Sequence, residues 1–127
     1  MGQTRKSKYK LLVVDDEPEI REFLTGFLCE KGLYEIIEAE TLGETLDIVS
    51  ELKDIDLVVL DLIMPDSKGL EALHAVREQN QDLPVVVLTG YPGLSKQSAS
   101  LGAKRHFEKP FVPNEIESEI FHMLGSN

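Results

Sequence analysis

The pentapeptide LVVLD at residues 57–61 decides the fold of this chain, because four apolar residues lead directly into one carboxylate. Two further runs of four apolar residues end in the same way, in acids or a hydroxyl: 11–14 before Asp15 and Asp16, and 85–88 before Thr89. Short, continuously apolar runs are typical of strands buried on both faces of a parallel sheet. We therefore expect three strands that each end at an oxygen-bearing side chain.

Amphipathic segments alternate with these runs and predict helices. In the first segment, apolar residues recur at helical spacing behind Pro18: Ile20, Phe23, Leu24, Phe27 and Leu28. Thr41, followed three residues later by Glu44, is a capping-box pattern that predicts the start of a second helix. Further helices are expected after Gly69, at about residues 95–101 and from Pro113, and weaker strands at 34–39 and 103–108.

Five strands alternating with five helices indicate an α/β fold, a doubly wound five-stranded parallel sheet with helices on both faces. Ligands of such folds bind outside the carboxyl ends of the strands. The residues that end or follow the predicted strands all carry polar groups: Asp15, Asp16, Asp61, Thr89 and Lys109. We expect them to share one pocket at that edge of the sheet.

The composition fits a single domain with no membrane or nucleic-acid role. The chain has 127 residues and a formal net charge of -10, and so acidic a body repels phosphate backbones. No apolar stretch approaches the roughly 20 residues that span a bilayer, and no secretory signal is present, so we expect a cytoplasmic protein. Residues 1–9 are predicted to be a basic, flexible tail, and residues 10–125 the folded domain.

The side chains at the strand ends suit metal-assisted phosphoryl chemistry. Magnesium ions prefer carboxylate oxygens, waters and phosphate oxygens, and Mn²⁺ is a possible substitute. Asp15, Asp16 and Asp61 offer the carboxylates, while Lys109 offsets their mutual repulsion. An ionised Asp61 can attack phosphorus to form an aspartyl phosphate, and the Thr89 hydroxyl can donate to the attached phosphoryl group.

These motifs together resemble the receiver domain of two-component response regulators, the CheY-like family. The resemblance runs from about residue 10 to 124 and is carried by four motifs: Val13-Val14-Asp15-Asp16-Glu17-Pro18, Leu60-Asp61-Leu62-Ile63-Met64-Pro65 with Gly69-Leu70-Glu71, Leu88-Thr89-Gly90, and Glu108-Lys109-Pro110-Phe111. The resemblance implies a flavodoxin-like (βα)5 three-layer sandwich with strand order 2-1-3-4-5.

The resemblance also implies a role for each matched residue. Asp61 is then the phosphoacceptor, and Mg²⁺ is held by Asp15, Asp16, Asp61 and the backbone carbonyl of Ile63. The phosphoryl group contacts Thr89 and Lys109, Gly90 leaves room for the donor, and the Lys109–Pro110 peptide is cis.

The chain departs from the family at the position three residues before the lysine. The family usually carries Tyr or Phe there, and that aromatic side chain relays the signal, whereas this chain has His106. Our hypothesis is that His106 fills the switch position and makes the output modestly pH-dependent, because imidazole takes up a proton near neutral pH.

The implied partners are a histidine kinase or phosphotransfer protein as donor, and a downstream effector protein or covalently linked output domain as reader. The domain is expected to catalyse only its own phosphorylation and slow dephosphorylation, so it is not predicted to be an enzyme. The last helix carries Glu115, Glu117 and Glu119 in place of basic residues, which favours a monomer or weak dimer.

Other functions of the same fold fit the sequence less well. A haloacid-dehalogenase-type phosphatase needs a second Asp where Ile63 stands, and the acids after residue 14 would repel a flavin phosphate. A dinucleotide site needs a glycine-rich turn there, which is absent. A receiver-like interaction module that acts without phosphorylation remains the alternative.

Overall fold

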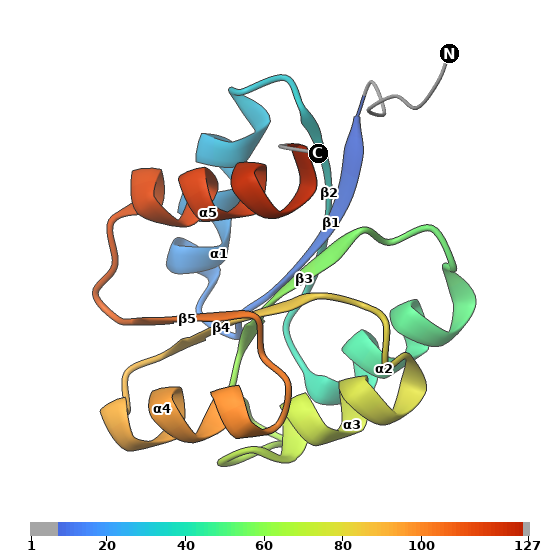
Figure 1. The fold of residues 1–127 in the computed structure, drawn as a ribbon, viewed down its shortest axis with the longest axis vertical. Coiled ribbons are helices and arrows are strands. Elements are labelled where there is room, and N and C mark those ends of the chain that lie inside the picture. The colour runs from blue at the N-terminus through green and yellow to red at the C-terminus, as the bar shows by residue number, and fades with distance from the viewer. Residues whose placement is uncertain (1–7, 126–127) are drawn as a thin grey trace.

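The computed structural model describes residues 8–125, in which five strands alternate with five helices (Figure 1). In chain order the elements are β1 Tyr9–Val14, α1 Pro18–Cys29, β2 Tyr34–Ala39, α2 Leu42–Glu51, β3 Leu57–Asp61, α3 Glu71–Gln79, β4 Val85–Thr89, α4 Pro92–Ser100, β5 Arg105–Glu108 and α5 Pro113–Gly125. No helix in this described part is long and apolar enough to cross a bilayer.

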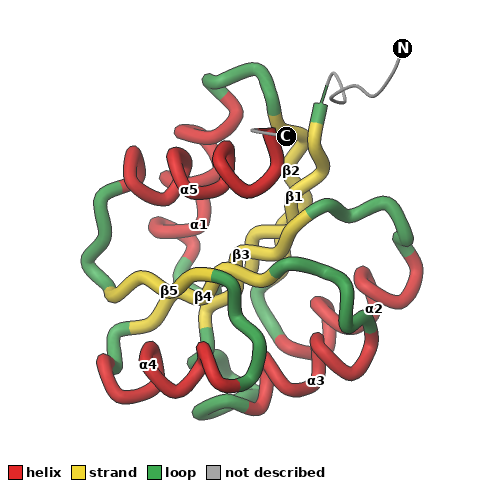
Figure 2. The backbone as a smooth tube through the Cα atoms, viewed as in Figure 1, coloured by secondary structure: helices red, strands yellow, loops and turns green. Residues whose placement is uncertain are grey.

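All strand pairs are parallel, and the sheet order is β2-β1-β3-β4-β5, as expected. Figure 2 shows the strands as a band between two groups of helices, with α1 and α5 on one side and α2, α3 and α4 on the other. The fold is therefore a doubly wound, three-layer α/β sandwich of the flavodoxin-like kind.

The central strands are buried on both faces because alternate side chains enter two separate cores. Val58 and Leu60 of β3 pack into the core beneath α2 and α3, whereas Leu57 and Val59 pack into the core beneath α1 and α5. Every residue of β3 and β4 is buried. Two-sided burial explains why these strands read as continuous apolar runs and not as alternating ones.

Helix α1 buries a narrower stripe than the sequence pattern indicates. Leu24 and Leu28 are fully buried against the sheet, but the side chain of Phe23 is 59% exposed. Because successive helical residues are about 100° apart around the axis, Phe23 points well away from the Leu24 direction. Phe23 shares the helical spacing of Leu24 and Leu28 but lies outside the buried stripe of α1.

Three expected boundaries also differ from the structure. Strand β5 begins at Arg105 and not at residue 103. Tyr9 was expected in the flexible tail, but it is the first residue of β1, where it pairs with Tyr34 and its amide donates to the Leu33 carbonyl at 2.8 Å. Residues 1–7 of that tail lie outside the described residues. Helix α4 begins at Pro92 and not near residue 95, because proline without an N–H is well suited to the first turn.

Candidate functional site: an acidic pocket at the strand ends

Four carboxylates gather at the carboxyl edge of the sheet. Oxygen atoms of four acidic side chains lie within 4.8 Å of one another: Asp15, Asp16, Glu17 and Asp61. Parallel pairing causes this, because β1 and β3 run side by side with Val14 opposite Leu60. The residues that follow these two partners therefore emerge together.

Lys109 enters the cluster from the end of β5. Its Nζ atom lies 2.8 Å from Glu17 Oε1, 2.9 Å from Asp15 Oδ2 and 3.2 Å from Asp61 Oδ2. Its backbone amide donates to the Thr89 carbonyl at 2.8 Å, which fixes the start of the side chain beside β4. One ammonium group thus faces three carboxylates.

Asp61 sits at the base of the pocket and is only 4% exposed. Its Oδ1 atom accepts a hydrogen bond from the Ile63 amide at 3.2 Å. Burial raises the pKa of Asp61 to about 7, and the charge of Asp15 acts in the same direction, while Lys109 opposes both. More positive charge in the pocket would therefore favour the ionised carboxylate.

Asp15 provides a carboxylate oxygen that suits a cation. The side chain is 1% exposed, and its Oδ1 atom accepts from the Glu17 amide at 2.9 Å. The only described partner of its Oδ2 atom is the Lys109 ammonium, at 2.9 Å. A buried carboxylate oxygen with so few partners, close to other carboxylates, fits the oxygen-rich ligand set of a hard divalent cation.

The charge on Lys109 is strongly retained. Burial alone would lower the pKa of Lys109, but the hydrogen bonds and charges of Glu17, Asp15 and Asp61 raise it above its usual range. The side chain is therefore a permanent cation at the edge of the pocket.

Above these groups lies a hollow of about 420 Å³, lined by Asp16, Glu17, Asp61, Ile63, Gly90, Tyr91 and Lys109. Thr89 is fully buried, and its Oγ1 atom accepts from the Tyr91 amide at 3.1 Å. That bond uses the hydroxyl as an acceptor, so its own proton can still be donated. Gly90 lines the open side without a side chain, which leaves space for a ligand.

His106 lies apart from these groups. It pairs with Val87 in the register of β4 and β5, its side chain is exposed, and it does not line the hollow. The Lys109–Pro110 peptide bond, which follows β5, is cis, as the resemblance implies.

Glu17 belongs to the acidic cluster, although the sequence pattern does not predict its contact with Lys109. Its side chain is exposed at the start of α1, and its Oε1 atom makes the shortest of the three Lys109 contacts. The signal that could have found it is its position directly after the acidic pair.

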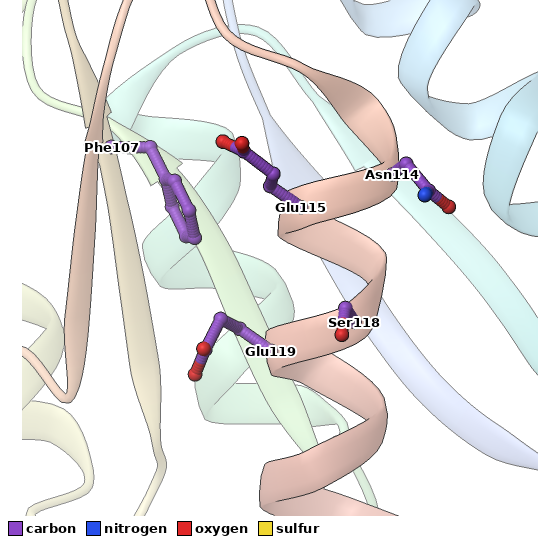
Figure 3. Close-up of a pocket in the computed structure, with 5 residues that line it drawn as sticks. All are labelled: Phe107, Asn114, Glu115, Ser118 and Glu119. Carbon is purple, nitrogen blue, oxygen red and sulfur yellow. The ribbon is translucent and has the colours of Figure 1, made fainter.

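A second hollow lies between β5 and α5 and is distinct from the acidic pocket. It measures about 390 Å³ and is lined by Phe107, Asn114, Glu115, Ser118 and Glu119 (Figure 3). It contains none of the expected site residues.

The family model of the response regulator receiver domain matches residues 11–121. The chain therefore belongs to the response regulator receiver domain family, which is a family of signalling domains in two-component systems.

Individual relatives agree with this assignment. A chemotaxis protein CheY homolog from Campylobacter jejuni is 30% identical over 121 residues, covering 92% of this chain and 93% of the relative. Response regulator MprA from a Mycobacterium species is 38% identical over 91% of this chain, which spans only 50% of that protein. A CheY-like receiver domain protein from Methanospirillum hungatei superposes with a TM-score of 0.85 at 28% identity, covering 94% and 96% of the two chains.

Proposed function

We propose that this chain is a phosphoacceptor receiver: Asp61 takes a phosphoryl group from a phosphohistidine in a magnesium-dependent reaction, and the product changes which partners bind. The observation that carries the proposal is the position of Lys109 within 3.2 Å of Asp61 Oδ2, in a pocket with three further carboxylates. A purely structural cluster has no need of a carboxylate at the base of an open hollow.

The metal ligands in this proposal are Asp15, Asp16, Asp61 and the backbone carbonyl of Ile63. The Oδ2 atom of Asp15 supports the proposal, because this buried oxygen has only the Lys109 ammonium as a described partner and can still take a hard cation as a ligand. Bound Mg²⁺, or Mn²⁺ in its place, supplies positive charge that keeps Asp61 ionised and balances charge on the phosphoryl oxygens.

The proposed reaction is a transfer between two residues. An oxygen of ionised Asp61 attacks phosphorus, and the bond between phosphorus and the donor imidazole nitrogen breaks. The electron pair stays on the imidazole, which becomes neutral if it was protonated at its other nitrogen, and Asp61 becomes an acyl phosphate. Lys109 then pairs with a phosphoryl oxygen, and Thr89 donates its hydroxyl proton to another.

The wider proposals follow from this chemistry. The donor is a histidine kinase or phosphotransfer protein, and the reader is an effector protein or a linked output domain. The domain acts in the cytoplasm as a monomer or weak dimer. It binds no nucleic acid itself and turns over no substrate beyond its own phosphorylation and dephosphorylation. Its acidic charge, -10 in total, supports the exclusion of nucleic acid.

The experiment uses phosphoramidate, a small donor whose P–N bond resembles that of phosphohistidine. The protein is incubated with it in Mg²⁺ or in EDTA, and the intact mass is followed with time. We expect a gain of one phosphoryl group only with Mg²⁺, followed by its slow loss when the donor is removed. A folded protein that never gains mass would favour the alternative, an interaction module that acts without phosphorylation.

A further inference from the structure

The loop that follows Asp61 is attached to a helix on the far side of the pocket. Asp66 Oδ1 accepts from the Leu42 amide at 2.8 Å, and Asp66 Oδ2 accepts from the Gly43 amide at 3.0 Å. Leu42 and Gly43 are the first two residues of α2, so their amides have no acceptor within the helix. One carboxylate thus accepts hydrogen bonds from two helix-end amides that lie more than twenty residues away in the chain.

The contact is favourable because it joins a negative charge to the positive end of a helix. The amides of Leu42 and Gly43 lower the pKa of Asp66 below its usual value, so the carboxylate is ionised at neutral pH. A charge-assisted bond of this kind is stronger than a neutral one, and two of them fix the direction of the carboxylate.

On its own side, Asp66 belongs to a closed turn. The amide of Met64 donates to the Ser67 carbonyl at 2.9 Å, and the amide of Ser67 donates back to the Met64 carbonyl at 3.1 Å. Pro65 restricts the backbone within this turn, and Met64 is 3% exposed in the core beneath α2 and α3. The turn is a rigid unit that Asp66 attaches to α2.

This turn directly follows Ile63, whose amide donates to Asp61 Oδ1 at 3.2 Å. We propose that Asp66 is a positioning residue for the phosphoacceptor site: by attaching the 64–67 turn to the start of α2, it holds the Ile63 backbone where its carbonyl can serve the metal. This inference rests on the proposed function, since it concerns the same metal site, and it adds a residue outside the pocket.

Thermodynamic linkage makes the coupling between the Asp66 contact and the metal site measurable at either site. If Asp66 holds the metal-binding backbone in place, bound metal must in turn strengthen the attachment of Asp66 to α2. Adding Mg²⁺ to the wild-type protein should therefore slow hydrogen exchange at the Leu42 and Gly43 amides. A residue that only stabilised α2 would give no metal-dependent change at these positions.

The test compares Mg²⁺ binding by calorimetry in the wild type, Asp66→Ala, Asp66→Asn and Thr41→Ala. Thr41→Ala is the matched control, because Thr41 Oγ1 accepts from the Glu44 amide at 3.1 Å and so caps the same helix without touching the turn. We expect Asp66→Ala to bind Mg²⁺ at least about fivefold more weakly, a typical coupling between sites. Asp66→Asn keeps one acceptor and should lie between, and Thr41→Ala should match the wild type.

Each other result has a definite meaning. Equal Mg²⁺ affinity in Asp66→Ala and wild type would overturn the inference and leave the proposed function standing. Equal weakening in Asp66→Ala and Thr41→Ala would also overturn it, because helix stability alone would then explain the effect. A folded wild type that binds no Mg²⁺ would overturn the proposed function and this inference with it. If Asp66→Ala does not fold, Asp66→Asn and the wild-type hydrogen exchange decide the question.

Discussion

The Nζ atom of Lys109 lies 3.2 Å from the Oδ2 atom of Asp61, although 48 residues separate them in the chain. Asp61 is 4% exposed, and Asp15 beside it is 1% exposed. The lysine therefore compensates carboxylates that would otherwise repel one another in a poorly solvated place. The same pair explains both the stability and the proposed reactivity of the pocket.

Replacing Lys109 with Gln should destabilise the metal-free protein at pH 8. The variant leaves buried Asp15 and Asp61 without their cation, and loss of one partner of a buried pair typically costs about 3 kcal/mol or more. Denaturant unfolding in EDTA measures the change. The double variant Asp61→Asn with Lys109→Gln should recover part of the loss, and a double variant no more stable than Lys109→Gln would contradict the explanation.

Asp61 should make the metal-free protein less stable as the pH rises from about 4 to about 7. The pKa of Asp61 is raised to about 7 in the fold, whereas an unfolded aspartate titrates near 4, at about 3.9. Between these values the folded state binds more protons than the unfolded state, so the free energy of unfolding falls with increasing pH. Below about pH 4 Asp61 is protonated in both states, so it no longer changes the free energy of unfolding.

Asp61→Asn should remove this decrease in the free energy of unfolding between about pH 4 and about pH 7. At pH 8 in EDTA the variant should exceed the wild type by more than about 1 kcal/mol, because each unit of pKa shift corresponds to about 1.4 kcal/mol. At pH 4 the two should agree. Glu22→Gln, at an exposed position of α1, serves as a control and should leave the wild-type profile unchanged. Parallel profiles for Asp61→Asn and the wild type would contradict the assignment.

Most residues of the pocket can be predicted from the sequence, because two simple rules bring them together. Continuous apolar runs identify the central strands, and parallel pairing then brings Asp15, Asp61 and Lys109 to one edge. The contacts of Glu17 and Asp66 were not predictable in this way. Glu17 reaches Lys109 only through its particular side-chain direction, and Asp66 meets α2 only through a tertiary contact spanning 24 residues.

The same limit explains why Phe23 is exposed although it shares the helical spacing of the buried residues. Helical spacing identifies which residues share a broad face, but the rotation of α1 on the sheet decides which of them are buried. Contacts with the sheet and with α5 select Leu24 and Leu28 for the core, and that choice depends on packing partners distant in the sequence.

Magnesium should stabilise the protein by binding the carboxylates of Asp15, Asp16 and Asp61. A ligand that binds only the folded state at ten times its dissociation constant adds about 1.4 kcal/mol, which corresponds to a few degrees in melting temperature for a domain of this size. Thermal unfolding with and without MgCl₂ measures the shift. Asp16→Asn should abolish this shift in melting temperature. Asp47→Asn is the control, because Asp47 lies in α2 outside the acidic cluster, and it should show the full shift. An unchanged shift in Asp16→Asn would exclude Asp16 as a ligand.

The His106 hypothesis predicts a local response to phosphorylation. Imidazole signals of the three histidines can be followed by NMR before and after addition of acetyl phosphate and Mg²⁺. We expect the His106 signal to move, while the signals of His74 on α3 and His122 on α5 stay in place as internal controls. If His106→Tyr leaves partner binding and its pH profile unchanged, the hypothesis that His106 is the switch residue is wrong.

The central claim is that Asp61 forms the covalent bond, and intact mass tests it most directly. Wild type and Asp61→Asn are incubated side by side with acetyl phosphate and Mg²⁺, after circular dichroism has shown that both are folded. The account predicts that the wild type gains one phosphoryl group and that Asp61→Asn gains none. Equal gain in both proteins, or no gain in a folded wild type, would contradict it.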